Sequence, residues 1–121
     1  MSALTDRNVL IVEDDAVVAI DLANLFRAQG ATVLGPAASV ASALSYIQTA
    51  TIDCAVLDVN LREEDCSPVA DLLAHADIPF VFVTAFDGHD VLSRHPSQPV
   101  VKKPFNQRDI ISATTEALAA A

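Results

Sequence analysis

Three acidic side chains, Glu13, Asp14 and Asp15, directly follow a run of four apolar residues, Val9 to Val12. Each ionised carboxylate raises the cost of ionising its neighbours. At ~4 Å and an effective dielectric of about 20, a like-charged pair costs about 4 kcal/mol. Such crowding can be the favourable negative charge of a helix N-terminus, or it can be the ligand set of a cation.

Polar residues also end three other short apolar runs. Asp58 ends "CAVLD", Thr84 ends "FVFVT", and Lys102 and Lys103 end "VVKK" before Pro104. Continuous apolar runs of this length are typical of strands that are buried on both faces of a parallel sheet. Because the carboxyl ends of parallel strands meet at one edge of the sheet, we expect these polar side chains to share one shallow pocket.

The charges in that pocket indicate a metal ion. Any three of the acids Glu13, Asp14, Asp15 and Asp58 together with one lysine leave two negative charges uncompensated, and one divalent cation would neutralise them. Carboxylate oxygens with few other ligands suit Mg²⁺, which keeps several of its waters. Three of these acids are therefore predicted to hold Mg²⁺.

The elements that must position these residues follow from the apolar periodicity, which alternates between strands and helices. Segment 88–99 has few apolar residues, a glycine at its start and two prolines, so we expect a fourth helix of at most one or two turns, or none. Five strand–helix pairs predict a parallel sheet with helices on both faces. Strands are expected at 9–12, 32–34, 54–58, 80–83 and from 100 to Pro104, and helices at 16–29 and after the caps Ser39, Ser67–Pro68 and Asn106.

Length and composition restrict the class of protein. The 121 residues are enough for one domain, and 52% of them are hydrophobic. The formal charge of −9 argues against nucleic acid and anionic membranes as partners, and no apolar stretch approaches the ~20 residues of a membrane span. Without a signal-peptide pattern or a disulfide framework, the expected location is the reduced cytoplasm.

A few isolated residues receive simpler interpretations. Cys54 lies in an apolar run and is expected in the core, whereas Cys66 lies in a polar stretch and is expected to be more exposed. The polar stretch from Val59 to Cys66 is interpreted as a loop. The three histidines, which are scattered along the chain, are interpreted as surface residues: His75, His89 and His95.

The motifs "VLIVEDD", "AVLDVNL", "FVFVTAF" and "VVKKPF", in this order and spacing, resemble the receiver domain of two-component response regulators. The resemblance covers essentially the whole chain, 1–121, and implies a receiver domain without an output domain. It also implies the flavodoxin-like α/β fold, with a single five-stranded parallel sheet in the strand order 2-1-3-4-5.

The resemblance assigns a role to each matching position. Glu13 and Asp14 match the metal-binding acidic pair, and Asp58 matches the phosphorylated aspartate. Asn60 matches the position whose backbone carbonyl completes the metal site. Thr84 matches the switch hydroxyl, and Lys103, before a proline that is cis in the family, matches the lysine that pairs with a phosphoryl oxygen.

The implied activity is Mg²⁺-dependent transfer of a phosphoryl group to Asp58 from a phosphohistidine of a sensor kinase or of a histidine phosphotransfer protein. The protein would not be an enzyme in the usual sense, because it would catalyse only its own phosphorylation and dephosphorylation. It would then dock a partner through the fourth helix, fifth strand and last helix, or act as a phosphoryl shuttle or sink.

Two features depart from the common receiver pattern. Val100 stands three places before Lys103, where many receivers have an aromatic switch residue. The segment "PFVFVTAFDG" partly resembles a receiver subgroup with the motif Phe-Ala-Thr-Gly and an altered fourth helix, although Val83 and Ala85 replace the alanine and the glycine.

Two other functions are compatible with the predicted fold. One is a receiver-like docking module that works without phosphorylation. Val100 and the weak fourth helix leave this alternative open, and the retained site residues argue against it: Glu13, Asp14, Asp58, Thr84 and Lys103. The other is a flavodoxin-like electron carrier, whose first loop would need Ser, Thr and Gly around a flavin phosphate. The acids at 13–15 would repel that phosphate, and the chain has no Trp and one Tyr to stack on a flavin.

Overall fold

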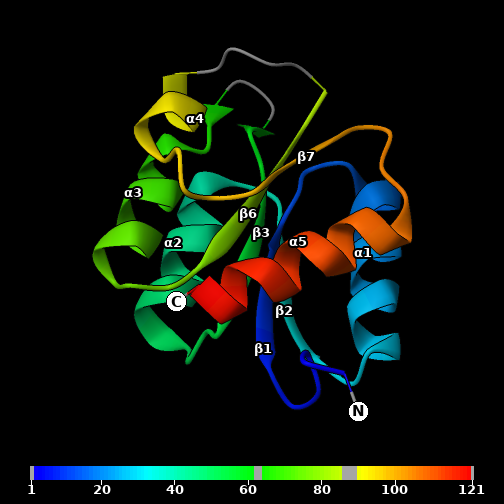
Figure 1. Ribbon diagram of the computed structural model, residues 1–121. Helices are drawn as coiled ribbons and strands as arrows, with labels where there is room; N and C mark the ends of the chain where they lie inside the picture. The colour runs from blue at the N-terminus through cyan, green and yellow to red at the C-terminus, as the bar shows by residue number, and fades with distance from the viewer. Residues whose placement is uncertain (1, 62–63, 86–89, 121) are drawn as a thin grey trace.

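Five parallel strands form the central layer of the structure, a computed structural model that describes residues 2–61, 64–85 and 90–120 (Figure 1). They lie in the order β2-β1-β3-β6-β7, so the predicted order 2-1-3-4-5 of a flavodoxin-like sheet is confirmed. β7 and β2 are the two edges. The strands are β1 (Asn8–Val12), β2 (Thr32–Ala37), β3 (Cys54–Asp58), β6 (Phe80–Thr84) and β7 (Val100–Lys102).

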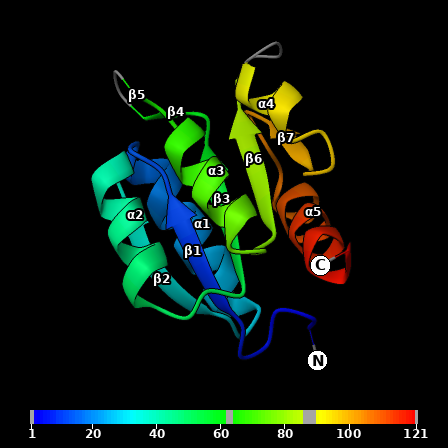
Figure 2. The same cartoon turned by 90° about the vertical axis from the view of Figure 1, so that its left-hand side faces the viewer.

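Helices cover both faces of this sheet, as Figures 1 and 2 show. α1 and α5 pack on one face, around Phe26 and Ile110. α2, α3 and α4 cover the other face, where Val91 of α4 joins the core. Successive strand residues therefore alternate between two cores: Leu10 belongs to one and Ile11 to the other. The helices are α1 (Ala16–Ala28), α2 (Val40–Thr49), α3 (Ser67–His75), α4 (Asp90–Arg94) and α5 (Gln107–Ala120).

The predicted signals at the helix ends are largely confirmed. Ser39 Oγ accepts the Ser42 N–H at 3.1 Å at the start of α2, and Asn106 Oδ1 accepts the Asp109 N–H at 2.8 Å at the start of α5. These side chains satisfy backbone donors that have no partner within the helix. Gly30, with φ +85°, follows the last residues of α1 in the left-handed conformation that glycine adopts readily.

The stretch after Asp58 is not the simple loop that was predicted. It contains an antiparallel pair, β4 (Asn60–Leu61) and β5 (Glu64–Asp65) (Figure 2). Leu61 is buried in the core, and the Cys66 N–H donates to the Val59 carbonyl at 2.9 Å, which draws the two ends of the hairpin together.

This hairpin corrects two further predictions. Cys66 is buried rather than exposed, because the hairpin turns it into the core under α3. Ser67 is the first residue of α3 and not its cap. The Asp65 carboxylate instead accepts the Ser67 N–H at 2.9 Å, two residues further along the chain.

The fourth helix is short, as predicted, with five residues in α4. The interpretation of His95 as a surface residue is wrong, because its side chain is only 12% exposed. Its ring lies edge-on to Phe80, with the ring centroids 5.5 Å apart, so it extends the core beside β6. His75 is exposed, as expected, and His89 lies outside the described residues.

Candidate functional site

Three acids meet at the carboxyl ends of β1 and β3. Glu13 and Asp14 directly follow β1, Asp58 ends β3, and the two strands are neighbours in register. One carboxylate oxygen from each of the three residues lies within 4.8 Å of the others. Glu13 and Asp58 are buried, with 2% and 7% of their surface exposed, and Asp14 is partly exposed. The structure therefore brings the three predicted metal ligands into one cluster.

Asp15, the third acid of the sequence triplet, has a different task. Its Oδ1 accepts the N–H groups of Val17 at 2.9 Å and of Val18 at 3.2 Å, so it caps the N-terminus of α1. The helix-cap interpretation is thus confirmed for Asp15, whereas the cation-ligand interpretation stays a prediction for Glu13 and Asp14. Asp15 is the helix cap, and Glu13 and Asp14 belong to the acidic cluster.

Lys103, the residue that follows the edge strand β7, supplies a positive charge to the cluster. Its Nζ lies 2.9 Å from Glu13 Oε1 and 3.4 Å from Asp58 Oδ1. The peptide bond to Pro104 is cis, as the resemblance implied. The side chain of Lys102, one residue earlier, is exposed. One ammonium group beside three carboxylates leaves the cluster negatively charged.

The protonation behaviour of the site reflects this excess of negative charge. Burial, followed by the hydrogen bond and the charge of Glu13, raises the pKa of Asp58 to about 7, against the opposing effect of Lys103. Burial alone would lower the pKa of Lys103. Its hydrogen bond to Glu13 and the charge of Asp58 outweigh that effect and raise the pKa instead. Lys103 therefore stays charged, while Asp58 needs a further cation to be fully ionised at neutral pH.

The donor set fits Mg²⁺. All three candidate ligand atoms are carboxylate oxygens, two of the three residues are buried, and the net charge of the cluster is negative. A hard divalent cation prefers such oxygen ligands and would supply the missing positive charge. Glu13, Asp14 and Asp58 are the side chains that would hold it.

The raised pKa of Asp58 predicts how the stability of the metal-free protein depends on pH. Between its ordinary value of 3.8 and its folded value of about 7, Asp58 is protonated only in the folded protein. The folded state then binds more protons than the unfolded state, so the free energy of unfolding falls as pH rises through this window. Above it, Asp58 is ionised in both states and adds no further pH dependence.

Urea unfolding in the presence of a chelator, followed by circular dichroism, measures this dependence. Asp58→Asn has no titrating group at this position, so its free energy of unfolding should not show the fall with rising pH that Asp58 causes. Parallel curves for the two proteins would contradict the assignment to Asp58.

The two remaining predicted site residues are Thr84 and Asn60. Thr84 ends β6, the strand next to β3 in the sheet, and Asn60 follows shortly after Asp58 in the chain. Thr84 is buried as the last residue of β6, and its carbonyl accepts the Lys103 N–H at 2.8 Å. Val83, the residue before Thr84, pairs with Asp58 in the sheet. Asn60 is exposed at the start of β4, two residues after Asp58. Val100, at the supposed position of an aromatic switch, is exposed on β7.

The sequence analysis overlooked an apolar surface next to the site. Val17 and Ile20, one helical turn apart on α1, are 70% and 58% exposed. Beside them, α1 and the segment after β7 enclose a hollow of about 450 Å³, which Lys103 and Phe105 help to line. The sequence carries a signal for this surface, because Val17 and Ile20 are apolar residues of α1 outside its buried face, which Leu22, Leu25 and Phe26 form together with two alanines.

Comparison with known proteins identifies the family. Residues 9–115 match the model of the response regulator receiver domain. The chain belongs to the response regulator receiver family. Receivers have a phosphorylation-receiving role in signalling, and they generally bind Mg²⁺ through acidic residues.

Similar receivers occur in both curated and solved proteins. The transcriptional regulatory protein PdtaR of Mycobacterium tuberculosis is 31% identical over 115 residues, which cover 92% of this chain and 56% of that protein. The phyllosphere-induced regulator PhyR of Methylorubrum extorquens is 26% identical over 114 residues, 91% of this chain and 43% of PhyR. The chain thus spans about half the length of these relatives.

A solved structure agrees over almost the full length of both chains. The solution structure of SdrG from Sphingomonas melonis Fr1 has a TM-score of 0.81 and 42% identity, and it covers 98% of this chain and 99% of that one.

In the part of the receiver that the structure describes, the helices lack the length and apolar character needed to cross a membrane.

Proposed function

We propose that Asp58 accepts a phosphoryl group, in a Mg²⁺-dependent reaction, from a phosphohistidine of a sensor histidine kinase or of a histidine phosphotransfer protein. The observation that supports this most directly is the carboxylate cluster around the buried Asp58. Asp58 lies at a strand end with two further acids and Lys103 around it. A cytoplasmic location follows from such a donor.

The chemistry suits these side chains. A carboxylate oxygen of Asp58 forms a bond to phosphorus while the phosphorus–nitrogen bond of the phosphohistidine breaks, and the electron pair of that bond stays on the imidazole. The product is an aspartyl phosphate. Lys103 Nζ lies 3.4 Å from Asp58 Oδ1 and would pair with a phosphoryl oxygen. Bound Mg²⁺ would neutralise charge on the transferring group. The protein thereby acts on itself and turns over no separate substrate.

The readout would begin at Thr84. Its hydroxyl would move toward the phosphoryl group and shift an equilibrium between two conformations. The surface formed by α4, β7 and α5 borders the carboxyl end of β6, where Thr84 lies. We call it the readout surface, because a downstream partner is proposed to dock there. A shuttle or sink for phosphoryl groups would use the same Asp58 chemistry without such docking.

The exposed apolar pair Val17 and Ile20 supports a protein as the donor. Exposed apolar residues beside an active site are typical of an interaction surface. Val17→Asp is expected to slow phosphoryl transfer from the cognate kinase by about tenfold, because it places a charge in a contact that must be desolvated. Labelling by a small donor such as acetyl phosphate should not change. Radiolabel transfer measures both rates.

The matched control is Val100→Asp, which makes the same substitution at an exposed position on β7. It should leave the transfer from the kinase unchanged. Equal losses with the two donors for Val17→Asp would show damage to the site itself and would contradict a docking role.

The proposed reaction is tested by an amide NMR titration with Mg²⁺ and then with beryllofluoride, which mimics the aspartyl phosphoryl group. We expect shifts around residues 13–14, 58, 84 and 103, and the beryllofluoride shifts should vanish in Asp58→Asn. Spread of the shifts into 90–119 would mark the readout surface. No response to either reagent would favour the phosphorylation-independent docking module.

A further inference from the structure

The helix α4 needs side-chain contacts to keep its position. It has five residues, far fewer than the roughly 12–15 that an isolated helix needs to be even marginally stable in water. Val91 is buried and anchors its first turn in the core. The last turn is anchored by different contacts, which are polar and come from α3.

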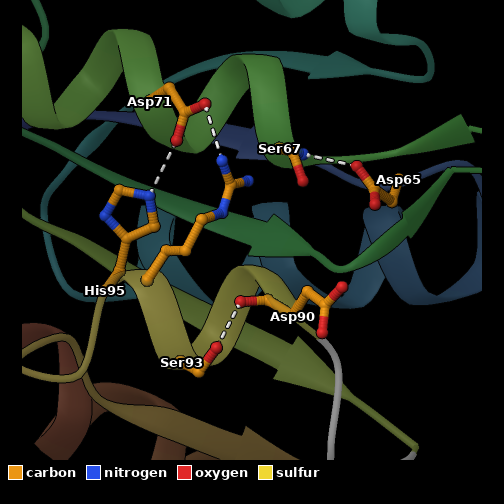
Figure 3. Close-up of polar contacts among 7 residues, drawn as sticks. Asp65, Ser67, Asp71, Asp90, Ser93 and His95 are labelled. Atoms are coloured by element: carbon orange, nitrogen blue, oxygen red, sulfur yellow. Dashed lines mark hydrogen bonds and ion pairs between the residues drawn. The ribbon is translucent and has the colours of Figure 1, made fainter.

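Asp71 of α3 makes these contacts with both of its carboxylate oxygens. Oδ1 lies 3.0 Å from His95 Nε2, and Oδ2 lies 3.3 Å from Arg94 Nη1. Figure 3 shows the Asp71 carboxylate above the His95 ring, which follows directly on α4. Because an ionised carboxylate only accepts hydrogen bonds, Nε2 must carry the hydrogen in this contact.

The two contacts are not equivalent. The side chains of Arg94 and Asp71 are 49% and 50% exposed, and ion pairs between such exposed groups contribute little. The His95 side chain, by contrast, is only 12% exposed and packs edge-on against Phe80 of β6. The contact with His95 is therefore the better shielded of the two, and it ties α3, the end of α4 and β6 together.

We propose that Asp71 is a positioning residue, whose hydrogen bond to His95 holds the end of α4 on α3 and so sets the orientation of the readout surface. The importance of that orientation rests on the proposed function, because α4 borders the surface that a downstream partner would read. The contact itself exists in the unphosphorylated protein and can be tested without any phosphoryl group.

The test is amide hydrogen exchange by NMR on the full chain without metal. The amide of residue 95 donates to the Leu92 carbonyl at 3.2 Å and reports on the end of α4. In Asp71→Ala we expect exchange to become about tenfold faster at this amide, and the amides of β3 to keep their rates. His95→Phe keeps a ring on Phe80 but lacks the N–H donor, so it should show the same increase.

A conservative variant separates positioning from a general loss of stability. The amide oxygen of Asp71→Asn still accepts a hydrogen bond in the same place, so slow exchange should be largely restored. Asp21→Asn, which removes an exposed carboxylate on α1, should leave the rate at residue 95 unchanged.

Two results would overturn the proposal. One is a wild-type exchange rate in His95→Phe, which would mean that ring packing alone holds the helix. The other is faster exchange in Asp71→Ala throughout the sheet. Failure of Asp58 to react with a phosphoryl donor would leave all these rates as they are, so the outcome for Asp71 is distinct from that of the proposed function.

Discussion

Asp14→Asn is expected to weaken Mg²⁺ binding by about a hundredfold or more, whereas Asp15→Asn leaves the affinity unchanged. The two residues are neighbours in sequence and carry the same charge. Asp14 contributes an oxygen to the acidic cluster, however, and Asp15 uses its carboxylate to accept two N–H groups of α1. Loss of a ligand charge removes direct attraction for the cation.

This pair of variants is well matched, because asparagine is as good a helix cap as aspartate and Asp15→Asn should fold normally. The chain has no Trp, so amide shifts in an NMR titration with Mg²⁺ are the direct measurement. Equal losses in the two variants would mean that general charge attracts the cation and would contradict a defined ligand set.

Lys103→Gln is expected to lower the stability of the metal-free protein by about 3 kcal/mol, because it removes the cationic partner of a buried carboxylate. The Lys103 Nζ lies 2.9 Å from Glu13 Oε1, and the Glu13 side chain is almost fully buried. We take the lower end of the usual range, since the lysine side chain retains some contact with water. In saturating Mg²⁺ the loss should shrink, because the cation would neutralise the same carboxylates.

Urea unfolding with chelator and with Mg²⁺ measures both effects. Arg108→Gln is the control: it removes the same charge from an exposed residue of α5 and should stay within about 0.5 kcal/mol of the wild type. If the two variants behave alike in the absence of metal, Lys103 is not the counter-charge of the acidic cluster.

Local signals in the sequence were enough for most of the fold. The apolar run Cys54–Asp58 and the caps Ser39 and Asn106 act within a few residues, and the structure has them where they were expected. The hairpin after Asp58 was not predictable in this way. Its base is closed by the bond from the Cys66 N–H to the Val59 carbonyl, a contact between residues seven positions apart that no local pattern encodes.

The burial of the His95 side chain was also not predictable from local sequence, because it depends on residues that are even further away in the chain. A lone histidine in a segment poor in apolar residues gives no local sign of burial. Its ring is largely shielded from water because two aromatic residues of β6, Phe80 and Phe82, and Asp71 of α3 contact it. Only the packing of α4 on α3 brings these groups together.

The acidic cluster was predictable as a group, because strand ends of a parallel sheet meet at one edge. The different roles of Glu13, Asp14 and Asp15 did not follow from the charge and apolar pattern, and only the resemblance to receivers separated Glu13 and Asp14 from Asp15. Glu13, Asp14 and Asp15 have similar side chains in consecutive positions, and whether each faces the pocket or the helix depends on backbone direction at the end of β1. The cap geometry of Asp15 decides this, and it is visible only in three dimensions.

The two-sided core has a kinetic consequence. The apolar pair on α1 belongs to the layer that α1 and α5 form, whereas α4 belongs to the layer with α2 and α3 on the opposite face of the sheet. A reader that contacts only the α4 part of the surface formed by α4, β7 and α5 would leave the apolar pair on α1 open to a donor, whereas a reader that also covers α5 would lie in the same layer as that pair. A reader of the first kind could stay bound while Asp58 is phosphorylated again, so one complex could pass through repeated rounds of signalling without dissociating.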